Sequence, residues 1–202
     1  MNASSAGIVL LAAGEGQRYG DIKQLASIEG EPMVRRAART ALATGATVVV
    51  VVGAHAAPVR AVLEDLPLHL VHHHHWQQGM GSSLAAGIRA LLDVLPSATG
   101  VLICLADQPT VGAAMLGRLL QRHHDAPERI LATGHGASMG PPALFPSDCF
   151  DTLIAWSGTR GAQALLEREA TRVETFAFGD LTDVDTPADL LQVREQMRYP
   201  PR

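Results

Sequence analysis

Apolar runs that end at turn residues alternate with stretches of helical periodicity along most of the chain. Several of the runs are apolar throughout, which is typical of parallel strands that are covered on both faces of a sheet. The pattern predicts strands at 7–13, 46–53, 68–71, 100–106 and 129–133. It predicts helices between them at 32–44, 56–65, 82–94 and 112–124. We therefore expect an α/β fold with a doubly wound, mostly parallel sheet and right-handed crossovers.

The last third of the chain is less regular. A stretch rich in glycine and proline, at 134–146, separates the last clear strand from the elements that follow it. The pattern then predicts helices near 148–156 and 160–169, a strand near 172–178 and a terminal helix from Pro187. We expect this part to add a small antiparallel element to the sheet. Earlier in the chain, Pro32 suits the first position of a helix and Gly45 suits a helix C-terminal cap.

Composition narrows the class of protein. A chain of 202 residues that is 47% hydrophobic can bury one core, so we expect a single domain over 1–202. The net charge of -4, without a basic block, argues against a nucleic-acid partner. Cys104 and Cys149 are too few for a zinc cluster or a disulfide scaffold and are expected to be reduced. The absence of a long apolar stretch and of a secretory signal predicts a cytoplasmic protein without a membrane partner.

The loop after the first strand, "LLAAGEGQRYG" at 10–20, is rich in glycine. Glycines let backbone N–H groups approach an anion closely. The loop is not a dinucleotide fingerprint, because Tyr19 stands where a small residue is needed, and it lacks the Gly-Lys-Ser/Thr of a P-loop. Arg18 and Lys23 add a planar fork and a point charge, which suit a triphosphate. An ordinary flexible turn with a solvated Arg and Lys is the alternative.

The stretch "LAAGEGQRYGDIKQ" at 11–24 resembles the signature loop of the nucleotidyltransferases that attach a nucleotide to the molybdenum cofactor. This family belongs to the wider group of glycine-loop pyrophosphorylases. Further segments match it in the right order and extend the resemblance over nearly the whole chain. They are "GMGSSL" at 79–84, "DQP" at 107–109, "GPPALF" at 140–145, "SGTRGAQALL" at 157–166 and "DVDTPADL" at 183–190. The resemblance implies a Rossmann-like nucleotidyltransferase fold, with 1–110 mainly nucleotide-binding and 111–202 mainly acceptor-binding.

Asp107 follows a predicted strand, at the end of the sheet where such folds present ligands. A carboxylate there can hold Mg²⁺ against nucleotide phosphates, or it can be a turn residue ahead of a proline. The resemblance implies that Asp185 joins Asp107 around the metal.

The segment that contains Asp185 also reads as a helix start. Thr186 is a good N-cap, Pro187 suits the first helical position, and Asp189 adds negative charge to the first turn. Helix capping accounts for these three residues but assigns no role to Asp183 or Asp185.

The resemblance implies contacts to both substrates. For the nucleotide they are Leu11, Ala12, Ala13, Gly14, Gly16, Lys23, His73, Gly79, Ser82, Ser83 and Asp107. For the acceptor they are Gln108, Pro109, Gly140, Pro142 and Gly161. The pair Ala12–Ala13 resembles the cytidine-selecting members, whereas guanosine-selecting relatives typically carry "LAGG". Ser82 or Ser83 can instead serve only to cap the helix that follows.

Four consecutive histidines at 72–75 invite a metal hypothesis. They cannot all face one ion from a strand, because alternate side chains point to opposite faces. We expect a polar loop here. His73 stands where relatives often have Asn, which implies a contact to the nucleotide.

The chain departs from the family in the segment expected to meet the acceptor. Relatives usually show an acid and a base where this chain has Thr159 and Gln163, and His or Asn where it has Pro141. Thr159 still suits a helix cap. These differences leave the identity of the acceptor open.

The resemblance implies a Mg²⁺-dependent transfer of CMP from CTP to the phosphate of molybdopterin, with release of pyrophosphate. Lys23 would stabilise the α-phosphate transition state, Arg18 would hold the β- and γ-phosphates, and a molybdoenzyme client or its maturation chaperone would be a further partner. One alternative is a transferase of the same fold that uses GTP or a sugar or polyol phosphate. Another is a carrier of the molybdenum cofactor without enzymatic activity.

Overall fold

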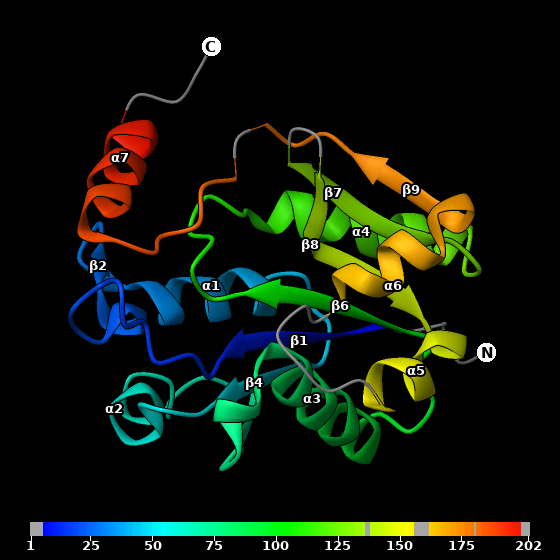
Figure 1. Ribbon diagram of the computed structural model, residues 1–202, viewed down its shortest axis with the longest axis horizontal. Coiled ribbons are helices and arrows are strands. Elements are labelled where there is room, and N and C mark those ends of the chain that lie inside the picture. Colours follow the sequence, from blue (N-terminus) through cyan, green and yellow to red (C-terminus); the bar gives the residue numbers. More distant parts are fainter. Residues whose placement is uncertain (1–5, 136–137, 156–161, 180, 199–202) are drawn as a thin grey trace.

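The computed structural model describes residues 6–135, 138–155, 162–179 and 181–198. Within these ranges, a seven-stranded sheet forms the centre of the molecule, in the order β5-β4-β1-β6-β8-β7-β9 (Figure 1). Its strands are β1 (Ala6–Ala12), β4 (Val48–Val52), β5 (His69–His72), β6 (Gly100–Leu105), β7 (Ile130–His135), β8 (Ser138–Pro146) and β9 (Val173–Phe176). A second, two-stranded antiparallel sheet pairs β2 (Ser27–Ile28) with β3 (Glu31–Pro32).

The middle of the sheet is parallel. β1 lies between β4 and β6 and runs parallel to both, so that Leu10 pairs with Val50 on one side and Cys104 on the other. Alternate residues of β1 pack into different cores, Leu10 into one and Leu11 into the other. A strand that is buried on both faces must be apolar at every position, and this is why the continuous apolar run in the sequence predicted the strand. The five predicted strands are confirmed, with ends that shift by one or two residues.

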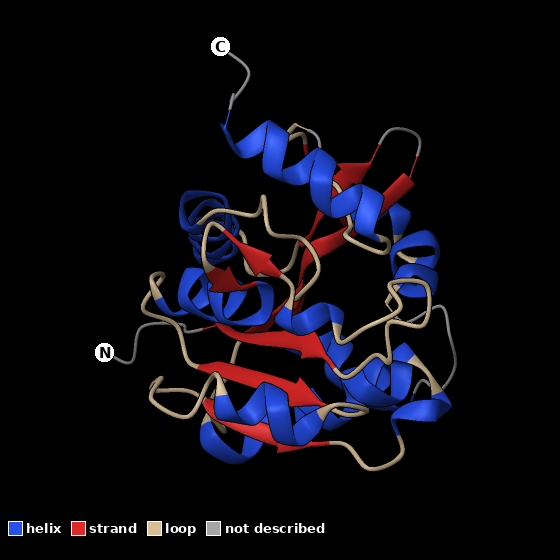
Figure 2. Cartoon of the chain, turned by 90° about the vertical axis from the view of Figure 1, so that its left-hand side faces the viewer, coloured by secondary structure: helices blue, strands red, loops and turns tan. Residues whose placement is uncertain are grey.

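Helices cover both faces of this sheet (Figure 2). One core gathers apolar residues of α3 (Met80–Val94), α5 (Phe150–Ala155) and α6 (Gln163–Arg168). The other gathers those of α1 (Met33–Leu42), α2 (Ala56–Ala61) and α4 (Ala113–Asp125). The prediction of a doubly wound α/β fold is therefore confirmed. None of the helices formed by the described residues has the length and apolar character that crossing a membrane requires.

The stretch at 134–146 was expected to be irregular, and this prediction was wrong in part. Residues 138–146 of this stretch form β8, antiparallel to both β6 and β7, and residues 134 and 135 end β7. Pro141 and Pro142 lack a backbone N–H, and they fall where the register of β7 against β8 shifts, between Ala132 and Thr133. The hydroxyl of Thr133 donates to the carbonyl of Pro142 at 2.8 Å. The shift thus accommodates two residues that cannot complete a regular ladder.

The C-terminal helix, α7 (Pro187–Arg198), packs at the edge of the molecule beside β2 (Figure 1). A third, small core holds it there, with Val184, Leu190 and Val193 packed against Ile28 and Met33. The carboxyl ends of β1 and β6 point toward this side, so the chain leading into α7 passes the end of the sheet where ligands of such folds bind.

Helix starts differ slightly from the prediction. α1 begins at Met33, and Pro32 stands at its N-cap and ends β3 instead of taking the first helical position. The helix ends at Leu42 with Ala43 as its C-cap, so the predicted cap at Gly45, which has φ +78°, lies two residues too far along the chain. Cys104 and Cys149 are buried free thiols, and burial raises the pKa of Cys104 to about 12 and that of Cys149 to about 11.

Candidate functional site

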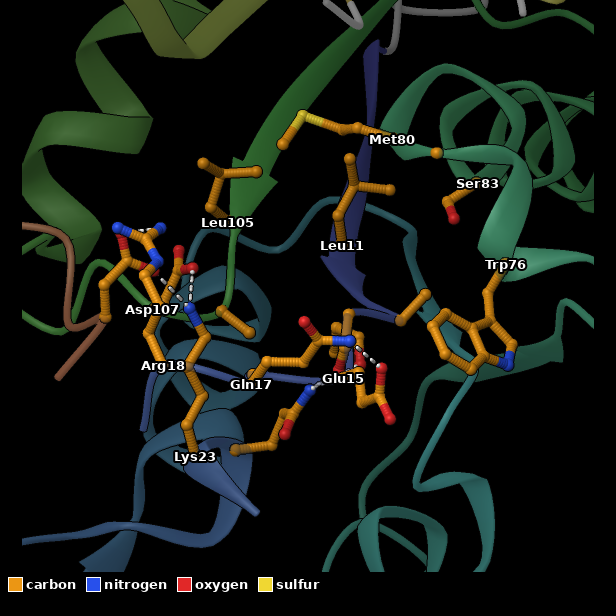
Figure 3. A pocket seen from close by; sticks show the side chains of 18 of the residues that line it. Leu11, Glu15, Gln17, Arg18, Lys23, Trp76, Met80, Ser83, Leu105 and Asp107 are labelled. Atoms are coloured by element: carbon orange, nitrogen blue, oxygen red, sulfur yellow. Dashed lines mark hydrogen bonds and ion pairs between the residues drawn. The ribbon is translucent and has the colours of Figure 1, made fainter. Parts of the chain in front are cut away.

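A cavity of about 660 Å³ opens at the carboxyl ends of β1 and β6 (Figure 3). Residues 13–18 of the glycine-rich loop form one wall, and the start of α3 forms another. Arg18, Lys23 and Asp107 gather at one end of it, and Trp76 and Ser83 lie at the opposite side. The cavity therefore has a charged end and a less charged end, which suits an elongated ligand that carries its charge at one extremity.

Backbone conformation explains the glycines of the loop. Gly16 has φ +70° and Gly20 has φ +81°, in the left-handed region that L side chains rarely adopt. A Cβ at position 16 would also lie 3.3 Å from Cγ of Lys23. At Gly14, a Cβ would meet no atom of the residues that the structure describes within 4 Å, so the backbone there is not covered by them. The loop thus offers bare backbone to the cavity beside the Lys23 side chain.

Gln24 holds the loop against the end of β1. Its side chain is 3% exposed, and its amide nitrogen donates to the carbonyls of Ala12 at 3.2 Å and Gly14 at 2.6 Å. Sequence reasoning did not single out this residue, although it ends the quoted motif. No pattern in the sequence marks this role, because a glutamine after a glycine loop can equally be exposed, although the carbonyls of such loops need a partner.

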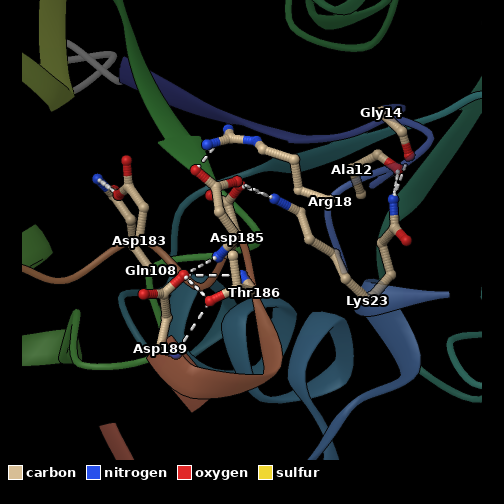
Figure 4. Close-up of polar contacts among 11 residues, drawn as sticks. Ala12, Gly14, Arg18, Lys23, Gln108, Asp183, Asp185, Thr186 and Asp189 are labelled. Carbon is tan, nitrogen blue, oxygen red and sulfur yellow. Dashed lines mark hydrogen bonds and ion pairs between the residues drawn. The ribbon is translucent and has the colours of Figure 1, made fainter. Parts of the chain in front are cut away.

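Lys23 joins segments that are far apart in the sequence (Figure 4). Its Nζ donates to Oδ2 of Asp107 at 2.7 Å and to Oδ1 of Asp185 at 2.9 Å. Arg18 donates from Nη2 to Oδ2 of Asp185 at 2.7 Å. The four residues predicted to hold metal and phosphates therefore meet at one end of the cavity, and together they carry no net charge.

Burial and charge act in opposite directions on the ammonium. Burial, the largest single influence, disfavours its charged form, but the carboxylates of Asp107 and Asp185 together raise the pKa of Lys23 above its ordinary value. Lys23 is consequently protonated at neutral pH. Its side chain is 12% exposed, whereas that of Arg18 is 74% exposed. Of the two cations, Lys23 is held between the carboxylates and largely shielded from solvent, whereas Arg18 is largely exposed to solvent.

The start of α7 fixes the position of Asp185. Oδ2 of Asp189 accepts hydrogen bonds from the backbone N–H of Asp185 at 3.0 Å and of Thr186 at 2.7 Å. The N–H of Asp189 in turn donates to the hydroxyl of Thr186 at 3.3 Å. This reciprocal pair is a capping box, and the predicted N-cap at Thr186 with Pro187 next to it is confirmed. The cap therefore anchors the residue that precedes it, which is Asp185.

A second cavity, of about 320 Å³, adjoins the first and shares Leu11, Met80 and Leu105 with it. Its floor is apolar. At its rim, the amide nitrogen of Gln108 donates to Oδ1 of Asp183 at 2.9 Å and to the carbonyl of Pro141 at 3.2 Å. Asp183, which capping left unexplained, is thus a wall residue of this second cavity.

Most residues predicted to bind the nucleotide line the first cavity. They are Leu11, Ala12, Ala13, Gly14, Gly16, Lys23, Gly79, Ser83 and Asp107. His73 and Ser82 do not line it. Nε2 of His73 lies 3.0 Å from Oγ of Ser82, whose hydroxyl donates to the carbonyl of Gly79 at 2.8 Å. Burial, with a smaller effect of the neighbouring histidines, lowers the pKa of His73.

The predicted capping of α3 by a serine was wrong. The helix begins at Met80, two residues earlier than expected, and Gly79 with φ +102° occupies the N-cap. Ser82 and Ser83 lie inside the first turn and are buried. A glycine N-cap has no side chain to cover the first N–H groups, so these remain directed outward from the helix start.

The residues predicted to bind the acceptor are divided. Gln108 and Gly140 line the second cavity. Pro109 and Pro142 line neither cavity, because both are buried on the protein side, where their carbonyls accept bonds from Arg36 and Thr133. Gly161 and Thr159 lie outside the described residues. Gln163, which replaces the expected base, opens α6 and lines the second cavity.

The histidines at 72–75 alternate in direction as expected. The ring of His72 lies 4.0 Å from that of His74, and the ring of His73 lies 6.4 Å from that of His75. Among the described residues, no three His, Cys, Asp or Glu side chains are grouped as a metal site.

Trp76, which follows the run of histidines, lines the first cavity and was missed by sequence reasoning. An aromatic residue just before the "GMGSSL" motif was the signal for it.

Comparison with known proteins places these cavities in context. Residues 8–173 match the family of the MobA-like NTP transferase domain. "Nicotine blue oxidoreductase" of Paenarthrobacter nicotinovorans is 32% identical over 200 residues, which cover 94% of each chain. "Purine catabolism protein PucB" of Bacillus subtilis (strain 168) is 30% identical over 206 residues, which cover 94% of this chain and 96% of that one.

Solved structures share the fold over almost the whole chain. Rv0371c from Mycobacterium tuberculosis H37Rv superposes with a TM-score of 0.84 at 28% identity, covering 96% of this chain and 100% of that one. A structure of the same protein in complex with manganese has a TM-score of 0.79 at 27% identity, covering 95% and 98% of the two chains.

Proposed function

Because the chain belongs to the family of the MobA-like NTP transferase domain, it is a nucleotidyltransferase, and we propose that it transfers CMP from CTP to the phosphate of molybdopterin or the molybdenum cofactor. Pyrophosphate is the second product. The observation that carries the proposal is the contact of Lys23 with both Asp107 and Asp185 beside the glycine loop. Three distant segments there combine cations for a triphosphate with carboxylates for a metal.

The nucleotide would lie along the first cavity. Its triphosphate would meet Lys23 and Arg18 at the charged end, and its base and ribose would lie near Ala12, Gly14 and Ser83. The bare backbone at Gly14 supports this orientation, because main-chain N–H groups can approach a ligand closely there. The Ala12–Ala13 pair, as in the cytidine-selecting relatives, supports CTP over GTP.

Asp107 fits a metal ligand. Its Oδ1 is buried and has no hydrogen-bond partner among the described residues, although its Oδ2 accepts from Lys23. A buried carboxylate oxygen without a partner is costly, and a cation would satisfy it. Mg²⁺ typically binds one or two carboxylates and fills its other positions with water and phosphate oxygens, which suits Asp107 and Asp185. We therefore propose Mg²⁺ as the cofactor, and the manganese complex of Rv0371c supports a divalent cation.

When bound, a divalent cation neutralises charge on the phosphates and helps to align them. Lys23 would stabilise the charge that develops on the α-phosphate, and Arg18 would hold the β- and γ-phosphates. An oxygen of the acceptor phosphate attacks the α-phosphorus as the bond to the bridging oxygen of pyrophosphate breaks. A phosphate monoester is already anionic at neutral pH, so the step needs no general base. Catalysis is then a matter of positioning and charge stabilisation.

The acceptor would occupy the second cavity. Its apolar floor and its polar rim of Gln108, Asp183 and Gln163 suit a flat heterocycle with polar edges better than a polyol. The shared residues, Leu11, Met80 and Leu105, would bring the two substrates together. The division of the chain into a nucleotide half at 1–110 and an acceptor half at 111–202 remains part of this proposal.

The test is to incubate the purified protein with labelled CTP, Mg²⁺ and molybdopterin and to look for a dinucleotide product. A panel of nucleoside triphosphates and simple phosphate esters, run in parallel, separates CTP from GTP and molybdopterin from sugar or polyol phosphates. Product from GTP alone would overturn the base assignment. Tight binding of the cofactor without release of pyrophosphate from any triphosphate would favour the carrier hypothesis and overturn the proposed reaction.

A further inference from the structure

Lys23 is the only lysine in the chain, and arginine occupies every other position that carries a permanent side-chain cation. The two residues differ physically. Lysine ends in a compact ammonium that behaves as a point charge, whereas arginine ends in a planar fork. The only lysine ammonium of this protein thus lies in the candidate site, where the second cation is the planar guanidinium of Arg18.

The ammonium of Lys23 lies between the two carboxylates proposed to hold the metal. Nζ is 2.7 Å from Oδ2 of Asp107 and 2.9 Å from Oδ1 of Asp185. A cation that binds Oδ1 of Asp107 and bridges to the carboxylate of Asp185 would lie beside the ammonium and compete with it for Asp185. The loop holds the base of the side chain, because Cγ of Lys23 lies against Gly16. Only the outer part of the side chain is placed to move away.

The balance of charge makes this competition strong. Lys23 and Arg18 neutralise the charges of Asp107 and Asp185. A divalent cation added alone would place two excess positive charges in a pocket where Lys23 is largely shielded from solvent. A triphosphate added with it supplies anionic oxygens that can receive the ammonium and the guanidinium. The negative charge of the triphosphate exceeds the positive charge of the metal, so both side-chain cations gain an anionic partner when the two bind together, whereas the metal alone adds only positive charge beside them.

We infer that the Lys23 ammonium occupies the cation position between Asp107 and Asp185 and yields it to a divalent metal only when a nucleoside triphosphate takes up the lysine. The inference rests on the proposed function, because it adopts the same metal ligands. It adds that metal and nucleotide bind cooperatively and that Lys23 excludes metal in the absence of nucleotide. Removing the lysine should therefore strengthen the binding of metal alone while it removes activity.

The experiment is a titration of Mn²⁺ followed by electron paramagnetic resonance, without nucleotide, in the full chain. Lys23→Met keeps a side chain of similar length and removes the charge. Arg122→Met is the matched control, since it removes one positive charge from an ion pair between α4 and β9, with Glu174 at 2.8 Å. We expect Lys23→Met to bind Mn²⁺ at least about tenfold more tightly than the wild type, and Arg122→Met to bind it as the wild type does.

A second measurement uses the wild type and does not depend on a variant that folds. Growth on ¹⁵N-lysine labels Lys23 alone, because it is the only lysine, and leaves all three of its N–H donors in place. We expect Mg²⁺ alone to leave the Lys23 side-chain ¹⁵N resonance unchanged, and Mg²⁺ with CTP to shift it. A shift with Mg²⁺ alone, or unchanged Mn²⁺ affinity in Lys23→Met, would overturn the inference.

The two proposals fail in different ways. Wild-type protein that forms the dinucleotide while Lys23→Met gains no Mn²⁺ affinity would leave the proposed function intact and remove the inference. Wild-type protein that transfers no nucleotide to any acceptor would remove the proposed function, whatever the Mn²⁺ titration gives.

Discussion

Nζ of Lys23 lies 2.9 Å from Oδ1 of Asp185, although 162 positions of sequence separate the two residues. The first belongs to the loop after β1, and the second to the segment that enters the C-terminal helix. Their contact closes the charged end of the first cavity, and it depends on how α7 packs against β2 and α1. The predictions below follow from this contact and from the residues that maintain it.

Replacing the lysine should remove catalysis without removing the fold. We expect Lys23→Ala to lower the turnover number by about 10²- to 10³-fold, because one cation directed at the developing charge is lost. Release of pyrophosphate at saturating CTP measures the effect, and circular dichroism checks the fold. Arg122→Ala, remote from the cavity, should retain wild-type turnover. Near-wild-type turnover in Lys23→Ala would refute its assigned role.

The capping box should matter for activity as well as for stability. Asp189→Ala removes the acceptor for the backbone N–H groups of Asp185 and Thr186, and we expect it to lower the free energy of unfolding by about 1 kcal/mol. It should also raise the Mg²⁺ concentration needed for half-maximal activity, because Asp185 is no longer anchored. Urea denaturation and a Mg²⁺ titration measure the two effects. Glu195→Ala, at an exposed position of the same helix, is the control and should change neither.

Gln24 should act through the backbone of the glycine loop. Gln24→Ala leaves the carbonyls of Ala12 and Gly14 without their donor, which we expect to cost about 1 to 3 kcal/mol in the free energy of unfolding. The KM for CTP should rise because the loop is no longer held to β1. Gln121→Ala removes an exposed amide on α4 and should stay within about 0.5 kcal/mol of the wild type. An unchanged KM in Gln24→Ala would show that the loop keeps its shape by other contacts.

Stability should fall below neutral pH because of a buried histidine. His123 is 1% exposed, and burial lowers its pKa below the ordinary value of 6.5. Below that pH the unfolded chain takes up a proton that the folded protein binds less readily, so the free energy of unfolding decreases as the pH falls. His73, whose pKa is also lowered, contributes with the same sign.

Denaturation between about pH 7.5 and about pH 5.5 measures this slope. We expect His123→Phe, which removes the titrating ring and keeps its shape, to flatten it. His69→Phe, the same change at an exposed position of β5, should leave it as in the wild type. An equally steep slope in His123→Phe would assign the pH dependence to other groups.

Gln163 should affect the acceptor and spare the nucleotide. It lines the second cavity where relatives usually carry a base, and Gln163→Ala removes one polar group from that wall. We expect the KM for the acceptor to rise about three- to tenfold, as for the loss of one hydrogen bond, with the KM for CTP unchanged. Steady-state kinetics with each substrate varied in turn measures both. A rise in the KM for CTP instead would contradict the separation of the two cavities.

Local pattern was sufficient for much of the fold. β1, β4 and β6 are buried on both faces, so their residues are apolar at every position. These continuous apolar runs were sufficient to predict the three strands from the sequence. The N-cap at Thr186 could be predicted for a similar reason, because capping requires particular residues within a few positions. The left-handed glycines of the loop belong to the same class of local requirement.

Neighbouring elements decided the rest. Pro141 and Pro142 disfavour a strand locally, yet β8 forms because β6 and β7 flank it and the register shift accommodates the prolines. Pattern alone also placed the start of α3 at a serine, whereas the helix begins at Met80, with Gly79 as its N-cap. The inward position of Gln24 was hidden because a glutamine gives no sign of whether it is buried.

The amino-acid sequence by itself determined the parallel core, the glycine loop and the identities of the charged residues, because each depends on residues close together in the chain. Only the tertiary structure decided that Lys23 bridges Asp107 and Asp185. That contact joins three segments whose meeting depends on the packing of α7 against a small apolar core, and no local pattern specifies a distance between residues so far apart.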